Sequence, residues 1–166
     1  MKVYADTSVF GGVFDEEFTE DSRKFFEELK AGKFDLVVSV LVAEEIASAP
    51  RQVRAYFGEL SPSAEIAEIG PEVLDLRDAY LAAGIVTRKS MDDAAHVALA
   101  TISGCAIIVS WNFDISQLRV QLFSCQSEKI LPKDSAIGKS AVLRSKVAHE
   151  ASCISKRYRN TMPSIS

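Results

Sequence analysis

The stretch that decides the fold is KVYADTSVFGG, residues 2–12. Lys2–Ala5 is a short strand-like run, and the polar residues 6–8 end it abruptly. A strand, a polar cluster and then a helix form the usual beginning of an α/β unit. The pair Gly11-Gly12 predicts a turn soon afterwards. These residues therefore predict an α/β domain with Asp6 at the carboxyl end of its first strand.

The same alternation of strands and helices continues as far as residue 110. The runs FDLVVS (34–39) and CAIIVS (105–110) are largely apolar, as expected for strands buried on both faces. Ser, Pro and Gly bound amphipathic or alanine-rich segments between them, which predicts helices over 23–31, 40–49, 53–60, 71–83 and 90–103. Residues 64–69 fit a short strand or a connector, 118–123 a strand or a helix, and 140–154 a helix. The alternation predicts a mostly parallel sheet covered by helices on both faces.

Length and composition fit one folded domain. The 166 residues are 48% hydrophobic and 25% charged, which excludes wholesale disorder and collagen-like repetition. No apolar run approaches the roughly 18–20 residues that cross a bilayer, and residues 1–10 lack the features of a signal peptide, so we expect a cytoplasmic protein without a membrane partner. Three separated cysteines and two histidines lack the spacing of a zinc site.

The net charge of −4 hides two oppositely charged parts. Residues 1–115 contain 10 Lys/Arg and 20 Asp/Glu, whereas residues 116–166 contain 9 Lys/Arg and 3 Asp/Glu. The acidic part would repel a nucleic acid unless bound cations reversed its local field.

Polar side chains follow the predicted strands or open the helices next to them. Because parallel strands end at the same edge of a sheet, Asp6, Asp93 and the pair Asn112/Asp114 are expected near that edge. Glu45 joins them from the helix over 40–49. Clustered carboxylates raise one another's pKa and are stabilised by hard divalent ions such as Mg²⁺. Such a site can activate water for phosphodiester hydrolysis.

Each of these residues also has a simpler structural interpretation. Asp6 fits the cap of the first helix, and Asp93 fits a capping box with Ser90. Glu45 is preferred over Glu44 because it lies three and four residues after Val42 and Leu41, beside the apolar stripe of its helix.

Three neighbouring side chains are interpreted as structural. His96, three residues after Asp93, fits a half-buried core histidine, and Trp111 fits packing better than base stacking. Cys105 fits the core. Glycine-rich phosphate loops are absent from the sequence, which disfavours enzymes that use a nucleotide cofactor. A phosphoaspartyl hydrolase, another enzyme with an aspartate directly after a strand, would need a second acid two residues after Asp6, but this position is Ser8.

Four segments in chain order resemble the PIN-domain family, in particular VapC-like toxin ribonucleases and their stand-alone relatives. The segments are VYADTSVFGG, VVSVLVAEEI, MDDAAHVALAT and IIVSWNFDI. Each alone is weakly specific, but together they cover residues 1–115 in the order of the family. The resemblance implies a three-layer α/β/α PIN-like fold with a mostly parallel central sheet.

The resemblance also implies a metal-dependent ribonuclease that hydrolyses RNA phosphodiester bonds. The catalytic residues that would hold Mg²⁺ or Mn²⁺ are Asp6, Glu45, Asp93 and Asp114. The supporting residues near the metal would be Thr7, Ser8 and Asn112. Asn112 and Asp114 compete for the fourth acidic position.

The end of the chain departs from the family pattern. We expect a PIN-like domain over 1–125 and an atypical basic C-terminal extension over 126–166. If this ending replaced the usual last strand and helix, the protein would instead be a catalytically inactive PIN-like module that binds RNA or a protein partner. The partners expected for an active enzyme are an RNA substrate, a second copy in a homodimer and, for a type II toxin, an antitoxin protein.

Overall fold

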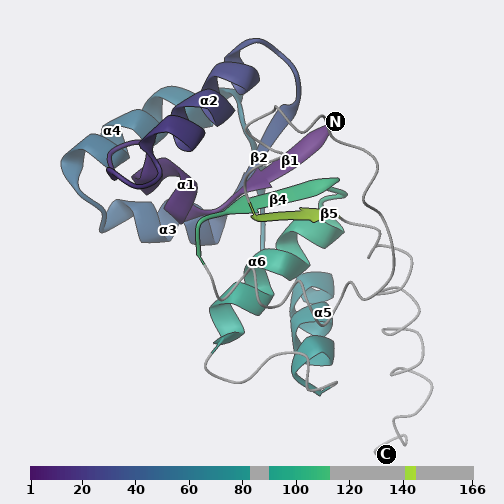
Figure 1. Cartoon of the computed structure of the whole chain (residues 1–166). Helices are drawn as coiled ribbons and strands as arrows, with labels where there is room; N and C mark the ends of the chain where they lie inside the picture. The colour runs from purple at the N-terminus through teal and green to yellow at the C-terminus, as the bar shows by residue number, and fades with distance from the viewer. Residues whose placement is uncertain (83–89, 113–140, 145–166) are drawn as a thin grey trace, which may run out of the picture.

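The computed structural model describes residues 1–82, 90–112 and 141–144 and places a five-stranded sheet at the centre of the molecule (Figure 1). The strand order is β3-β2-β1-β4-β5, with the first four parallel and β5 antiparallel to β4. The strands are β1 (Lys2–Ala5), β2 (Asp35–Ser39), β3 (Glu65–Ala67), β4 (Ile107–Ser110) and β5 (Ala141–Arg144). The predicted mostly parallel sheet is confirmed.

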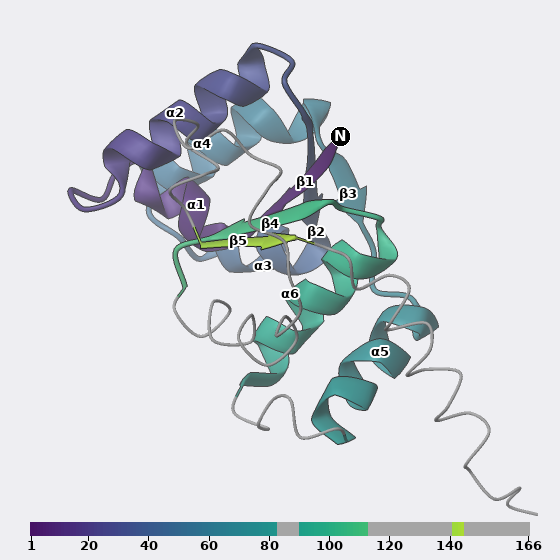
Figure 2. The same cartoon turned by 45° about the vertical axis from the view of Figure 1, so that its right-hand side comes forward.

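Helices cover both faces of the sheet. They are α1 (Thr7–Gly12), α2 (Thr19–Lys30), α3 (Val40–Ala47), α4 (Arg51–Leu60), α5 (Pro71–Ala82) and α6 (Met91–Ile102). Figures 1 and 2 show α1, α2 and α4 on one face and α5 and α6 on the other, which makes three layers. Within the ranges that the structure describes, none of these helices has the length and apolar character needed to cross a membrane.

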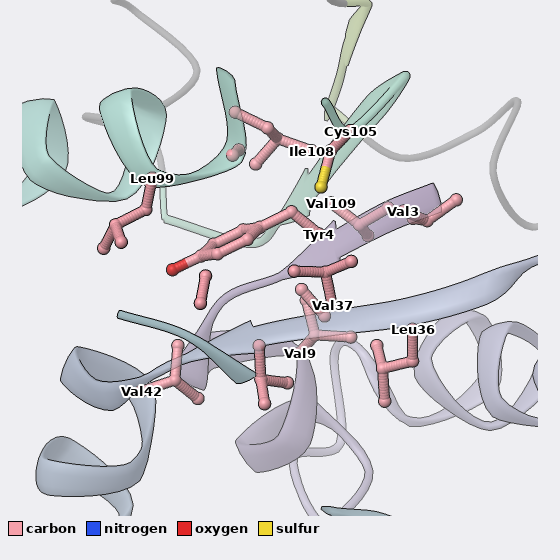
Figure 3. Packing of buried hydrophobic residues seen from close by; sticks show 14 of the residues in the cluster. Val3, Tyr4, Val9, Leu36, Val37, Val42, Leu99, Cys105, Ile108 and Val109 are labelled. Atoms are coloured by element: carbon pink, nitrogen blue, oxygen red, sulfur yellow. The ribbon is translucent and has the colours of Figure 1, made fainter. Parts of the chain in front are cut away.

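The core lies where the two helical layers meet the sheet. Val3, Val37 and Val109 of the three central strands are all completely buried. Figure 3 shows these three valines in one packed cluster with Val9 of α1 and Leu99 of α6. This two-sided burial explains why the strand sequences are continuous apolar runs rather than alternating ones.

A short helix, α1, occupies the place where the glycine pair predicted a turn. Its N-cap is Asp6, and burial of Val9 and Phe10 stabilises it despite two helical glycines. Gly12 has a packing role, because a Cβ there would lie 2.7 Å from the indole nitrogen of Trp111. The predicted turn follows directly after this helix, because the backbone N–H groups of Phe14 and Asp15 donate to the carbonyl oxygens of Gly11 (3.0 Å) and Gly12 (3.2 Å). The helix itself was not predicted, and its burial outweighs the low helix propensity of glycine.

Other element predictions differ from the structure mainly at their ends. The second helix begins at Thr19 instead of residue 23, and residues 65–67 form a strand. Residues 141–144 were predicted as part of a helix and instead form β5, whose pairing with β4 outweighs local preference. Predictions for 118–123 and for the end of the 71–83 helix lie outside the described residues. The boundary at residue 125 stays a prediction, and β5 lies within the proposed extension.

Candidate active site

The carboxyl ends of β1, β2 and β4 meet at a topological switch point. From β1 the chain moves outward through β2 to β3, and then returns to place β4 on the other side of β1. Ligands of open α/β sheets bind outside the strand ends at such a point. Asp6 follows β1 here, Ser39 ends β2, and Ser110 ends β4.

Asp6 is buried at the switch point, with only 3% of its surface exposed. Its Oδ1 accepts hydrogen bonds from the backbone N–H of Ser8 (3.0 Å) and of Val9 (3.4 Å), so it caps α1 as the simpler interpretation predicted. Burial raises the pKa of the Asp6 carboxyl, while hydrogen bonds from Ser110 and Ser8 oppose the rise. A cation bound nearby would favour the ionised form of this carboxyl.

Two serine hydroxyls join the segment after β1 to the segment after β4. Ser8 Oγ donates to Asp6 Oδ1 (2.6 Å) and accepts from the Trp111 backbone N–H (2.8 Å). Ser110 Oγ donates to Asp6 Oδ2 (2.5 Å) and accepts from the Asn112 backbone N–H (2.9 Å). Ser8 was predicted as a supporting residue, whereas Ser110 was missed although it stands in the quoted segment IIVSWNFDI. Both serines orient the Asp6 carboxylate.

Asp93 lies in the first turn of α6 and faces the segment after β4. Its Oδ1 accepts a hydrogen bond from Asn112 Nδ2 (3.0 Å). Ser90, the predicted cap of this helix, has φ −102° and ψ 32° and makes no capping hydrogen bond with its side chain. The Ser90 half of the predicted capping box is wrong, because an N-cap side chain needs an extended backbone to reach the helix N–H groups.

Glu45 reaches the same edge from α3, and its two carboxylate oxygens are held by different helices. Thr7 Oγ1 donates to Oε2, and His96 Nε2 lies 3.3 Å from Oε1. These hydrogen bonds, that of His96 first, lower the pKa of the Glu45 carboxyl although partial burial opposes them. Glu44 and Glu45 are both exposed, and Glu45 is the one that these contacts join to α1 and α6; its preference over Glu44 as a metal ligand stays a prediction.

His96 belongs to a buried polar network that sequence reasoning missed. It is 3% exposed, and its Nδ1 lies 2.7 Å from the hydroxyl of Tyr4. The same hydroxyl lies 2.7 Å from Ser39 Oγ, which also accepts from the backbone N–H of Val42 (3.3 Å). The only signal in the sequence was the spacing of His96 from Asp93, which says nothing about Tyr4.

Trp111 and Cys105 have the structural roles that were predicted. The Trp111 ring stacks on Phe18 with centroids 5.3 Å apart, and its Nε1 donates to Ser22 Oγ (2.8 Å). Cys105 is completely buried, and burial raises the pKa of its thiol to about 12, which keeps it protonated.

The donor atoms at this edge fit a hard divalent cation in kind. Asp6, Glu45 and Asp93 supply carboxylate oxygens, and neighbouring hydroxyl and amide oxygens are ligands of the same class. In residues 1–82, 90–112 and 141–144, however, no three His, Cys, Asp or Glu side chains lie close enough together to hold a metal ion. Asp114, the predicted fourth member, lies outside the described residues, so its competition with Asn112 stays a prediction.

The fold agrees with the comparison to known families. Residues 3–121 match the family model of the PIN domain, and because this is well over half of the chain, the protein belongs to the PIN-domain family. PIN domains are typically nucleases and generally use divalent metal ions. Among curated proteins no match was found.

Proposed function

We propose that this protein is a metal-dependent ribonuclease that hydrolyses RNA phosphodiester bonds. The main support is the set of hydrogen bonds that brings acids from distant segments to one sheet edge. Asp6 is joined to β4 by Ser110, and Asp93 to the segment after β4 by Asn112. Thr7, the residue that follows Asp6 in the chain, donates a hydrogen bond to Glu45.

The residues proposed to hold Mg²⁺ or Mn²⁺ are Asp6, Glu45, Asp93 and Asp114. When bound, the ion would lower the pKa of a coordinated water and offset charge on the phosphate. Ser8 and Ser110 keep the buried Asp6 carboxylate in one orientation, and Asn112 orients Asp93. Fixed donors of this kind favour catalysis because they need no rearrangement during the reaction.

An RNA substrate would meet a strongly acidic surface, since residues 1–115 contain twice as many acidic as basic residues. A bound cation would lower this repulsion at the site itself. The candidates for contacts to the RNA backbone are Arg88, Lys89 and the basic residues of 116–166. Of these, Arg144 ends β5, and the others lie outside the described residues.

The test compares two aspartates in the same helical turn. Asp93→Asn removes the charge of a proposed ligand, whereas Asp92→Asn changes its exposed neighbour. With Mg²⁺ or Mn²⁺, Asp93→Asn should lower the rate of RNA cleavage by more than about 100-fold, because changes beside a metal ligand alone cost about 10–100-fold. Asp92→Asn should cleave at the wild-type rate. Equal rates in the two variants, both folded, would overturn the assignment of Asp93.

One observation favours a second candidate, a catalytically inactive PIN module that binds RNA or a protein. Both oxygens of Asp6 already accept hydrogen bonds, and the described residues alone do not form a group of three metal ligands. This candidate predicts no RNA cleavage and no change in melting temperature on adding Mn²⁺. Cleavage that EDTA abolishes would exclude it.

The partner proposals come from the family resemblance. As a type II toxin, the protein would pair with an antitoxin protein that covers the acidic edge and inhibits cleavage. A small DNA-binding protein encoded next to it would support this role, and co-purification with loss of ribonuclease activity would test it. The proposed homodimer is tested separately, by the mass of the purified protein in light scattering.

A further inference from the structure

The carboxylate of Glu45 is more restrained than its position on the surface requires. The side chain is 45% exposed, and a glutamate with that exposure ordinarily samples several rotamers. Here Thr7 of α1 holds Oε2, and His96 of α6 lies 3.3 Å from Oε1. Two donors from different elements therefore restrict one carboxylate, and each oxygen keeps a second lone pair.

The imidazole that contacts Glu45 is itself fixed from behind. His96 is 3% exposed, and Tyr4 and Ser39, which follow it in the network, are completely buried. The Tyr4 hydroxyl lies 2.7 Å from both His96 Nδ1 and Ser39 Oγ. The ring therefore has little freedom to turn away from Glu45.

The donors and acceptors of the network fit together in one direction. Ser39 Oγ accepts from the backbone N–H of Val42, so its own hydrogen is available for the Tyr4 oxygen. Tyr4 then donates its hydrogen to Nδ1 of His96. An ionised carboxylate only accepts, so the proton of a neutral imidazole belongs on Nε2, which faces Glu45.

We propose that His96 is a positioning residue, which holds the Glu45 carboxylate in the orientation that binds the divalent cation. The inference rests on the proposed function, because it assigns Glu45 as a metal ligand. A core histidine that only satisfied the Tyr4 hydroxyl would need Nδ1 alone. The network instead continues through Nε2 to Glu45, in the way that outer-shell groups commonly orient metal ligands.

Two amide substitutions separate the positioning role from a structural one. In His96→Gln the side-chain amide reaches the place of Nε2, so a donor to Glu45 remains. In His96→Asn the amide reaches the place of Nδ1, so a partner for Tyr4 remains and the donor to Glu45 is lost. Mn²⁺ affinity is measured by electron paramagnetic resonance, and folding by urea denaturation.

The positioning role predicts that His96→Asn binds Mn²⁺ about 10–100-fold more weakly than wild type. His96→Gln should stay within about fivefold of wild type. Equal Mn²⁺ affinities in the two variants, or weaker binding by His96→Gln than by His96→Asn, would overturn the positioning role of His96. The proposed function would still stand in that case if the wild type binds Mn²⁺. A wild type that binds no Mn²⁺ would overturn both.

A measurement on the unmodified protein covers the case in which neither variant folds. Long-range ¹H–¹⁵N spectra show which nitrogen of a histidine carries the proton, and the chain contains only His96 and His149. The inference predicts a proton on Nε2 of His96 and none on Nδ1, with a shift of the Nε2 resonance when Mg²⁺ is added. A proton on Nδ1 alone, or no shift at saturating Mg²⁺, would overturn it.

Discussion

Replacing Tyr4 with Phe removes one hydroxyl from the buried network while leaving the ring in the core. That hydroxyl lies 2.7 Å from both Ser39 Oγ and His96 Nδ1. All three residues are at most 3% exposed, so water has little access to replace the lost partner. A buried polar group left without a partner costs about 1–3 kcal/mol. Ser39 and His96 would each lose one partner while the apolar contacts of the ring are retained, which predicts a loss of about 2–6 kcal/mol.

The matched control is Tyr80→Phe. Tyr80 is also completely buried, but its hydroxyl has no hydrogen-bond partner of normal geometry in the part of the chain that the structure describes. Because a buried hydroxyl without a partner itself costs about 1–3 kcal/mol, its removal should leave the free energy of unfolding unchanged or raise it. Urea unfolding followed by circular dichroism measures both variants. Equal free energies of unfolding for Tyr4→Phe and Tyr80→Phe would refute the reasoning about the network.

Three further variants test the packing and charge of the site. Gly12→Ala should lower the free energy of unfolding by about 1–3 kcal/mol, because the new Cβ would lie 2.7 Å from Trp111 Nε1. In Gly11→Ala the new Cβ meets nothing within 4 Å, so this variant should gain up to about 1 kcal/mol. Equal melting temperatures for the two variants would contradict this prediction. Burial raises the pKa of the Asp6 carboxyl, so the folded state binds its proton more tightly than the unfolded state does. The protein should therefore lose stability as pH rises from about 4 through the folded pKa. Asp6→Asn should lack this loss, and parallel pH profiles of unfolding for wild type and variant would contradict the prediction. Hydrogen bonds lower the pKa of the Glu45 carboxyl, so its contribution to folding stability is present above about pH 4.3 and is lost as pH falls through the folded pKa. In Glu45→Gln the free energy of unfolding should fall less steeply at acid pH than in wild type. An unchanged acid pH dependence would show that these hydrogen bonds add no stability.

The strands and most helices could be predicted because their patterns depend on local burial. The run DLVVS of β2 and the alanine-rich α6 carry enough apolar residues to identify them without any knowledge of the neighbours. The helix α1 could not be predicted in this way. Its glycines favour a turn locally, and Gly12 is explained by packing against Ser22 of α2 and against Trp111, which lies 99 residues later in the chain.

In the candidate site too, the residues with a local sequence signal could be predicted, and those whose role depends on distant partners could not. Asp6, Asp93 and Asn112 stand out in the sequence as polar residues next to apolar strands or opening an apolar helix. Tyr4 and Ser110 lie within strands and look like ordinary strand residues there. Their roles depend on partners 92 and 104 residues away, and no local pattern encodes such pairings.

The central proposal is that Asp6, Glu45 and Asp93, together with Asp114, bind one metal centre at the end of β1. A crystal grown with Mn²⁺ and measured near the manganese absorption edge tests this directly. We expect one anomalous peak within coordination distance of carboxylate oxygens from Asp6, Glu45 and Asp93. Saturating Mn²⁺ with no peak there, or with peaks only at other surface carboxylates, would contradict it.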